Sequence, residues 1–197
     1  MKMNELSKKF TFLMVFIFFV MIIFVGIGFG VFAAYPGEVT YQEENGGNIV
    51  INYSADFAGL RIKEATPITD ALALKIEDSD SYFDFSVDVL LDKAKEINYE
   101  IAAIKNTAFS TISDDDIRIC LEQEDSGEYK TVSDPSSFIP LKTESKLGTK
   151  PGNMVLSTVK KTTSGSDHYR LRMWLSDKSL LTSGSYEIEI VVNGYTK

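Results

Sequence analysis

The sequence predicts a mainly β protein, in which an N-terminal transmembrane helix precedes a two-sheet antiparallel β-sandwich. Three observations predict this fold class: one long apolar run near the N-terminus, apolar residues at alternate positions over much of the remainder, and turn residues between the alternating stretches. Without its first 34 residues, the chain of 197 keeps 163. A chain of that length holds one domain with a core of its own.

The apolar run covers residues 10–34 and contains no charged side chain in 25 positions. About 20 such residues are enough for a helix to cross the hydrocarbon core of a bilayer, and a helix bonds all its backbone polar groups internally. Lys2, Lys8 and Lys9 precede the run, and acidic residues follow it. Because basic residues favour the cytoplasmic side, we expect the N-terminus inside and the bulk of the chain outside.

These features divide the chain into four parts. Residues 1–9 form a cytoplasmic tail, 10–34 a signal-anchor helix, 35–46 a linker and 47–197 the extracytoplasmic sandwich. Cleavage by signal peptidase is the alternative, because small residues lead up to Ala34. The run is longer than the roughly 7–15 apolar residues of a cleaved signal, which favours retention as an anchor.

Period-two alternation predicts short strands along the outer domain. They are expected at 47–53, 59–64, 71–76, 83–91, 97–103, 117–121 and 154–159. The strands at 83–91 and 97–103 are expected to form a hairpin, although apolar residues from Val87 to Ile97 also fit helical spacing.

The clearest alternation lies near the C-terminus. Tyr169, Leu171, Met173 and Leu175 share one face, and Tyr186, Ile188, Ile190 and Val192 share one face of the following stretch. If these two strands pair with each other, arginines of the first meet glutamates of the second, which contributes roughly 0.2–1 kcal/mol per pair. Many short strands separated by turns predict a two-sheet sandwich.

Charge and cysteine content exclude several function classes. The first 34 residues hold three of the 20 bases and one of the 28 acids, so the outer domain carries a net charge of −10. Such a surface repels nucleic acid, and we expect no nucleic-acid partner. Cys120 is the only cysteine, so an intrachain disulfide is impossible. An outer domain without disulfides favours a bacterium with a single membrane.

The charge is unevenly distributed along the outer domain. Residues 64–128 hold 17 acids and five bases, whereas residues 142–172 hold seven bases and two acids. This asymmetry favours head-to-tail contacts between copies of the chain, which produce open filaments when the rotation does not close.

A family resemblance rests on two portions of the chain, Thr66 to Ile104 and His168 to Asn193, with the motifs ITD, YFDFSV and HYRLRMWLSD. With the apolar anchor, they make the chain resemble single-pass surface proteins of Gram-positive bacteria, which look distantly like the camelysin and TasA type of matrix-fibre subunit. The resemblance implies a jelly-roll or Ig-like sandwich at the cell surface. The chain lacks enough matching residues to carry over any metal ligand.

Two acidic clusters are the candidates for a metal site. Asp78, Asp80 and Asp84 form one, and Asp114, Asp115 and Asp116 form the other. Carboxylates of this kind are ligands for Ca²⁺. Neither cluster fits the EF-hand loop, and aspartates that start turns by bonding their own backbone are the favoured interpretation. No other cofactor is expected.

Arg170, Arg172 and Trp174 share one face of a predicted strand and are the candidate binding surface for a sugar or a peptide. The alternative is that this face is covered or forms a salt-bridged exterior. Cys120 lies with Arg118 and Glu122 on one face and is expected to be a packed apolar group.

The sequence shows no catalytic constellation. His168 is the only histidine, and no GxSxG motif provides a serine nucleophile. We therefore expect a non-enzymatic membrane protein at the cell surface, with a binding, adhesion or assembly role. Its expected partners are the membrane through residues 10–34, and other copies, surface proteins or polysaccharide. A membrane-tethered hydrolase using His168 and an accessory subunit of an envelope complex are the alternatives.

Overall fold

The computed structural model describes residues 38–42, 47–54, 58–63, 65–92, 94–181 and 183–196. They belong to one compact unit, residues 36–197. The predicted tail at 1–9 and the predicted anchor helix at 10–34 lie outside the described residues. Among those described, no helix has the length and hydropathy that a membrane span requires.

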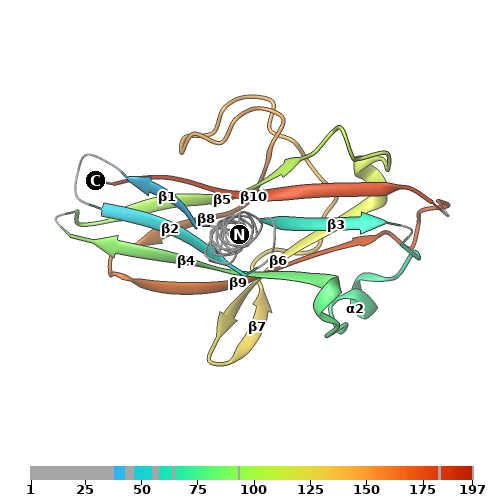
Figure 1. Ribbon diagram of the computed structural model, residues 1–197, viewed down its shortest axis with the longest axis horizontal. Coiled ribbons are helices and arrows are strands. Elements are labelled where there is room, and N and C mark those ends of the chain that lie inside the picture. The colour runs from blue at the N-terminus through green and yellow to red at the C-terminus, as the bar shows by residue number, and fades with distance from the viewer. Residues whose placement is uncertain are drawn as a thin grey trace, which may run out of the picture. The chain divides into compact units, whose positions relative to one another are not determined.

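The described residues form ten strands in two antiparallel sheets, which lie as two layers in Figure 1. Sheet A has the order β1-β2-β4-β9-β6-β7, and sheet B has the order β3-β10-β5-β8. The strands are β1 (Glu38–Gln42), β2 (Gly47–Tyr53), β3 (Gly59–Lys63), β4 (Tyr82–Leu91), β5 (Ile97–Lys105), β6 (Ile117–Asp125), β7 (Glu128–Thr131), β8 (Met154–Lys161), β9 (Gly165–Leu175) and β10 (Ser185–Thr196). The helical elements are α2 (Asp70–Ala73) and the 3₁₀ turns η1 (Ser79–Ser81) and η2 (Asp114–Asp116). The predicted mainly β, two-sheet class is confirmed.

The core lies between the sheets and consists of the predicted apolar faces. Side chains of successive strand residues point to opposite faces, so every second residue enters the core. Its members include Phe83, Phe85, Val87 and Val89 of β4, Tyr169, Leu171, Met173 and Leu175 of β9, and Tyr186, Ile188, Ile190 and Val192 of β10. Stacked rings continue through it, because Phe85 lies 5.5 Å from Phe83 and 5.4 Å from Tyr169 between ring centroids.

A buried polar contact joins the two sheets inside this core. Tyr99 of β5 in sheet B and Tyr169 of β9 in sheet A are hydrogen-bonded through their hydroxyls at 3.0 Å. The Tyr99 hydroxyl also donates to Asp167, 3.0 Å away, and Lys161 donates to the other oxygen of that carboxylate. Burial raises the pKa of Tyr169 to about 12. The pair therefore stays uncharged and fixes the central strands against each other.

Strands β2 and β3 close one side of the sandwich by crossing from one sheet to the other. β2 pairs with β4 in sheet A, whereas β3 pairs with β10 in sheet B. Five residues separate the end of β2 from the start of β3. Between them, the Ala58 carbonyl accepts a hydrogen bond from the Ile190 amide. Gly59 permits this crossing, because a Cβ there would collide with the Ile188 carbonyl. Figure 1 shows both strands in front of the two layers.

Two predicted strand pairings are wrong. β4 and β5 were expected to form a hairpin, but β4 pairs with β2 and β9 in sheet A, and β5 pairs with β10 and β8 in sheet B. β9 and β10 likewise belong to different sheets. The alternation of each strand fixes which face is buried, but not which partner completes its hydrogen bonds.

The predicted strand at 71–76 is also wrong, because residues 70–73 form helix α2. Thr69 caps this helix by accepting a hydrogen bond from the Leu72 amide at 3.4 Å. Ala73 is buried, whereas Leu72 is exposed. The alternation of leucines came from a short helix lying on a sheet rather than from a strand. The predicted linker at 35–46 needs a correction too, because β1 lies within it and pairs with β2.

Candidate binding surface on the outer face of sheet A

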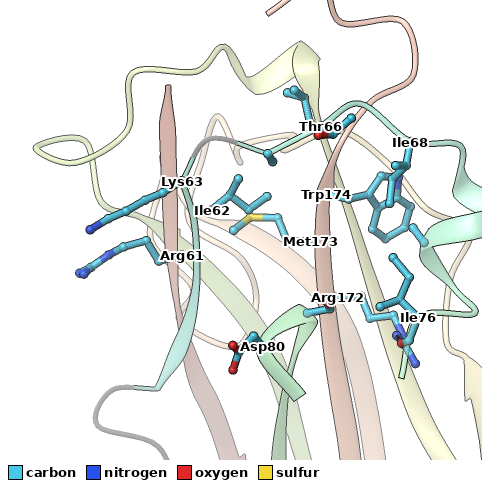
Figure 2. Close-up of a pocket in the computed structure, with 14 residues that line it drawn as sticks. Arg61, Ile62, Lys63, Thr66, Ile68, Ile76, Asp80, Arg172, Met173 and Trp174 are labelled. Carbon is cyan, nitrogen blue, oxygen red and sulfur yellow. Dashed lines mark hydrogen bonds between the residues drawn. The ribbon is translucent and has the colours of Figure 1, made fainter. Parts of the chain in front are cut away.

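The outer face of sheet A carries the arginines and the tryptophan that the sequence singled out. Arg170, Arg172 and Trp174 alternate with core residues of β9, so they point away from sheet B. The connection 65–81, which includes α2, folds over part of this face. Figure 2 shows Arg172 and Trp174 on one side of β9, together with Ile68 and Ile76 of that connection.

Arg172 is at the centre of a buried ionic network. Its side chain is 3% exposed and donates to Glu122 of β6 at 2.7 Å. It also donates to the Ile76 carbonyl and, at 3.4 Å, to Glu77. Glu122 is buried as well. The network therefore binds the 65–81 connection to the sheet through a charge that has little access to water.

Arg170 is held between two tyrosine rings. Its guanidinium lies 3.6 Å from the Tyr82 ring centroid and 4.2 Å from the Tyr129 centroid. It donates to both carboxylate oxygens of Asp84, at 2.8 and 2.9 Å, and to Glu77 at 2.9 Å. The Asp84 hydrogen bonds raise the pKa of Arg170 above its ordinary value. This bidentate geometry fixes the plane of the guanidinium and hence the position of the Tyr129 ring.

Trp174 lies under α2 and not on an open platform. It is 5% exposed, packs with Ala73 and Cys120, and donates its indole N–H to Asp70 at 3.1 Å. Arg118 donates to the same carboxylate at 2.8 and 3.2 Å, and this hydrogen bonding holds the pKa of Asp70 below its ordinary range. Burial raises the pKa of Cys120 to about 12, so its thiol stays protonated as a packed group.

A cavity of about 240 Å³ lies beside β9 where sheet A lacks a neighbouring strand. β4 begins opposite Arg172, and beyond that point the edge of β9 on the β4 side meets a parallel bridge from Ile68, while β6 continues to pair with the other edge. Figure 2 shows Ile62 and Met173 pointing toward each other there, with the ends of Arg61 and Lys63 directed away. Arg61 and Lys63 of β3 line this cavity beside Ile62, so its wall is partly apolar and partly charged.

Among the predicted calcium ligands, the carboxylates of Asp78, Asp84 and Asp114 are engaged in other contacts. Asp78 caps η1 by accepting a hydrogen bond from the Asp80 amide at 3.2 Å, and Asp84 holds Arg170. Asp114 accepts from Lys105 and from the Tyr186 hydroxyl, both at 2.6 Å. Asp115 and Asp116 complete η2. In the part of the chain that the structure describes, no three carboxylate, histidine or cysteine side chains converge as metal ligands would.

An open groove of about 320 Å³ lies farther along the same face. Asn52, Ser86 and His168 occupy directly opposed positions on β2, β4 and β9, so they form one row across three strands. Tyr129 of the β6–β7 hairpin also lines the groove, and Figure 1 shows this hairpin projecting from the sheet. Within the described ranges, neither the Ser86 hydroxyl nor the His168 imidazole has a hydrogen-bond partner, although both residues belong to the β4–β9 ladder. The row therefore presents the Asn52 carbonyl oxygen, the Ser86 hydroxyl and the His168 imidazole to the groove.

The charge asymmetry of the sequence is partly neutralised within the chain. Arg170 and Arg172, from the basic stretch, pair with carboxylates of the acidic stretch, and Lys160 pairs with Glu96 at 2.6 Å. Lys150 and Lys161 have partners too. Fewer unpaired charges remain for contacts between copies than the sequence suggested.

Sequence reasoning found β9 but missed the residues that complete the groove. Asn52 and Tyr129 come from strands far from β9 in the sequence. Tyr129 lies in a four-residue strand, too short for alternation to indicate which face it occupies. The Ser126-Gly127 turn before it was the available signal for a hairpin.

No family model matches the chain, and no curated protein matches it in sequence.

Proposed function

We propose that the chain is a membrane-anchored protein of the cell surface, whose β-sandwich lies outside the cytoplasm and binds another surface component without catalysis. The apolar run at 10–34 and the lysines before it support the anchor and its orientation. The observation that carries the binding role is the open groove on sheet A, which the polar row and the partly exposed Tyr129 ring line beside the ion pairs of Arg170.

The finer fold class we propose is a jelly roll rather than an Ig-like sandwich. In an Ig-like domain, several pairs of consecutive strands share a sheet. In the described part of this chain, every step from β2 to β6 and from β7 to β10 changes sheet. Successive strands that alternate between two sheets are typical of jelly rolls.

The test of anchoring and location uses the full chain in its membrane. After an alkaline carbonate wash, the chain should remain with the membrane pellet, and protease added to protoplasts should digest the sandwich. Recovery in the soluble fraction, or protection of residues 47–197 until the membrane is broken, would overturn the proposal. Vesicles carrying the full chain should also sediment with purified cell-wall material more than empty vesicles do, and equal sedimentation would refute the binding role.

The hydrolase alternative has one supporting observation, because Ser86 and His168 are opposite each other across β4 and β9. A serine nucleophile requires a hydrogen bond to its base and a sharp turn that exposes it. Ser86 lies within a regular strand, and in the described part of the chain its hydroxyl is not hydrogen-bonded to the His168 imidazole. Binding is therefore the better supported function.

Assembly of copies is a second candidate, and exposed apolar side chains at one end of the sandwich favour it. Leu180 is 97% exposed in the β9–β10 connection, and Phe109 is exposed in the β5–β6 connection. The two connections meet where the Ser185 amide donates to Thr111 at 3.0 Å. If this end joins copies, Leu180→Ser should lower the sedimentation coefficient of the full chain in detergent. An unchanged coefficient would remove this candidate.

A further inference from the structure

The groove on sheet A combines an immobilised aromatic ring with a row of hydrogen-bonding side chains. Asn52, Ser86 and His168 lie on adjacent strands, which are about 4.8 Å apart. The Asn52 amide donates to Asp88 at 2.7 Å, which leaves its carbonyl oxygen for a ligand. The row thus offers an amide oxygen, a hydroxyl and an imidazole at regular spacing along one line.

Tyr129 provides an apolar surface beside this row. Arg170 lies against its ring at 4.2 Å, and Asp84 fixes Arg170 in turn. Burial raises the pKa of the Tyr129 hydroxyl above its ordinary value, so the ring remains neutral at physiological pH. A ring that is already fixed loses little conformational entropy when a ligand packs on it. The groove is therefore organised before the ligand arrives.

The charges around the groove select against anions. Asp84 lines it, and Asp88 lies one row away on the same face of β4. The one cation beside Tyr129 among the described residues is Arg170, whose charge is neutralised by Asp84 and Glu77. A phosphate-rich or uronic-acid polymer would meet carboxylates without an available cation. A neutral ligand would meet only hydrogen-bonding groups and a ring.

A pyranose ring fits this combination, because it has a C–H face that packs on an aromatic ring and a rim of hydroxyls that both donate and accept hydrogen bonds. The groove is shallow and open to solvent, so a polymer chain can cross it without threading an end. We propose that the outer face of sheet A binds a neutral polysaccharide, with one sugar packed on Tyr129 and its hydroxyls bonded by Asn52, Ser86 and His168. This inference rests on the proposed surface-binding function and specifies its ligand class.

The test uses the full chain in a mild detergent on a microarray of neutral and anionic glycans, followed by titration calorimetry with the neutral oligosaccharide bound best. Tyr129→Ala should weaken that binding by about tenfold, or about 1.4 kcal/mol. Tyr129→Phe keeps the ring and should bind within about threefold of the wild type, a change of roughly 0.6 kcal/mol. Leu72→Ala removes an exposed apolar side chain of α2 outside the groove and is the control, with unchanged binding expected.

A second variant keeps the test decisive if Tyr129→Ala disturbs the hairpin. Ser86→Tyr fills the floor of the groove from a regular strand and should weaken binding by at least about tenfold. The inference is overturned if no neutral glycan binds above the detergent background, if anionic glycans bind better, or if both groove variants bind like the wild type. A chain that is anchored and outside the cytoplasm but binds no glycan would overturn this inference alone. A chain found in the soluble fraction would overturn the proposed function instead.

Discussion

Replacing Arg172 with methionine tests whether a buried charge network holds the 65–81 connection on sheet A. Methionine keeps much of the side-chain volume but leaves Glu122 buried without its cation and the Ile76 carbonyl without its donor. Removing one member of a buried ion pair costs about 3–5 kcal/mol. For a domain of this size, that corresponds to a fall in melting temperature of roughly 6–20 °C.

The double variant Arg172→Met/Glu122→Leu makes the test specific. It removes both charges, so no carboxylate remains buried alone, and it should be more stable than the single variant by at least about 1 kcal/mol. The Lys130–Asp125 pair is on the surface, so Lys130→Met is the control and should not change stability measurably.

The assay is urea unfolding of the full chain in detergent. Trp174 is the only tryptophan and packs beside the network, so its fluorescence reports on this region, and circular dichroism reports on the strands. The reasoning is refuted if Arg172→Met costs less than about 1 kcal/mol, or if the double variant is less stable than the single one.

Three other predictions concern the core and the titratable groups. Because burial raises the pKa of Cys120 to about 12, its thiol should not react with a disulfide reagent at pH 8 until urea unfolds the chain. Rapid reaction of the thiol in the native protein would contradict the burial of Cys120. Burial favours the neutral form of Glu187, but hydrogen bonds from Arg61 and Asn106 outweigh it and lower the pKa below the ordinary 4.5. The stabilisation from Glu187 is therefore complete above pH 4.5 and is lost as the pH falls through the lower pKa of the folded state. In a plot of the urea midpoint against pH, Glu187→Gln should make the fall in midpoint on the acid side less steep than in the wild type. Equal slopes for the two proteins would refute this. Leu171→Ala should lower the free energy of unfolding, measured in urea, by about 2–5 kcal/mol, whereas Leu180→Ala should change it by no more than about 0.5 kcal/mol. Similar changes for the two variants would contradict the burial of Leu171 and the exposure of Leu180.

The faces of the strands were predictable from the sequence because alternation is a local signal. The core positions of β9 and β10 follow directly from a period of two, and both sets are buried as expected. Sheet membership was not predictable in the same way. Arg170 could form an ion pair with a glutamate of β10 or with Asp84 of β4, and either carboxylate would neutralise its charge. Which of the two lies beside it depends on hydrogen bonding between strands that are distant in the sequence.

The covered and open parts of the outer face were also beyond local reasoning. Trp174 and His168 lie on the same face of β9 and look equivalent in the sequence. Trp174 is covered by α2, whose leucines had suggested a strand, while His168 remains exposed. What separates them is the path of the 65–81 connection, which is fixed by the ion pairs of Glu77 with Arg170 and of Asp70 with Arg118 rather than by any periodic pattern.

Labelling of introduced cysteines in intact cells is the most direct test of a sandwich displayed outside a membrane anchor. The native Cys120 is buried, so it serves as an unreactive background. A membrane-impermeant maleimide should label Glu128→Cys, on the exposed hairpin, in intact cells, and should label Ser7→Cys only after the membrane is broken. Labelling of Ser7→Cys in intact cells, or failure to label Glu128→Cys before lysis, would contradict the account.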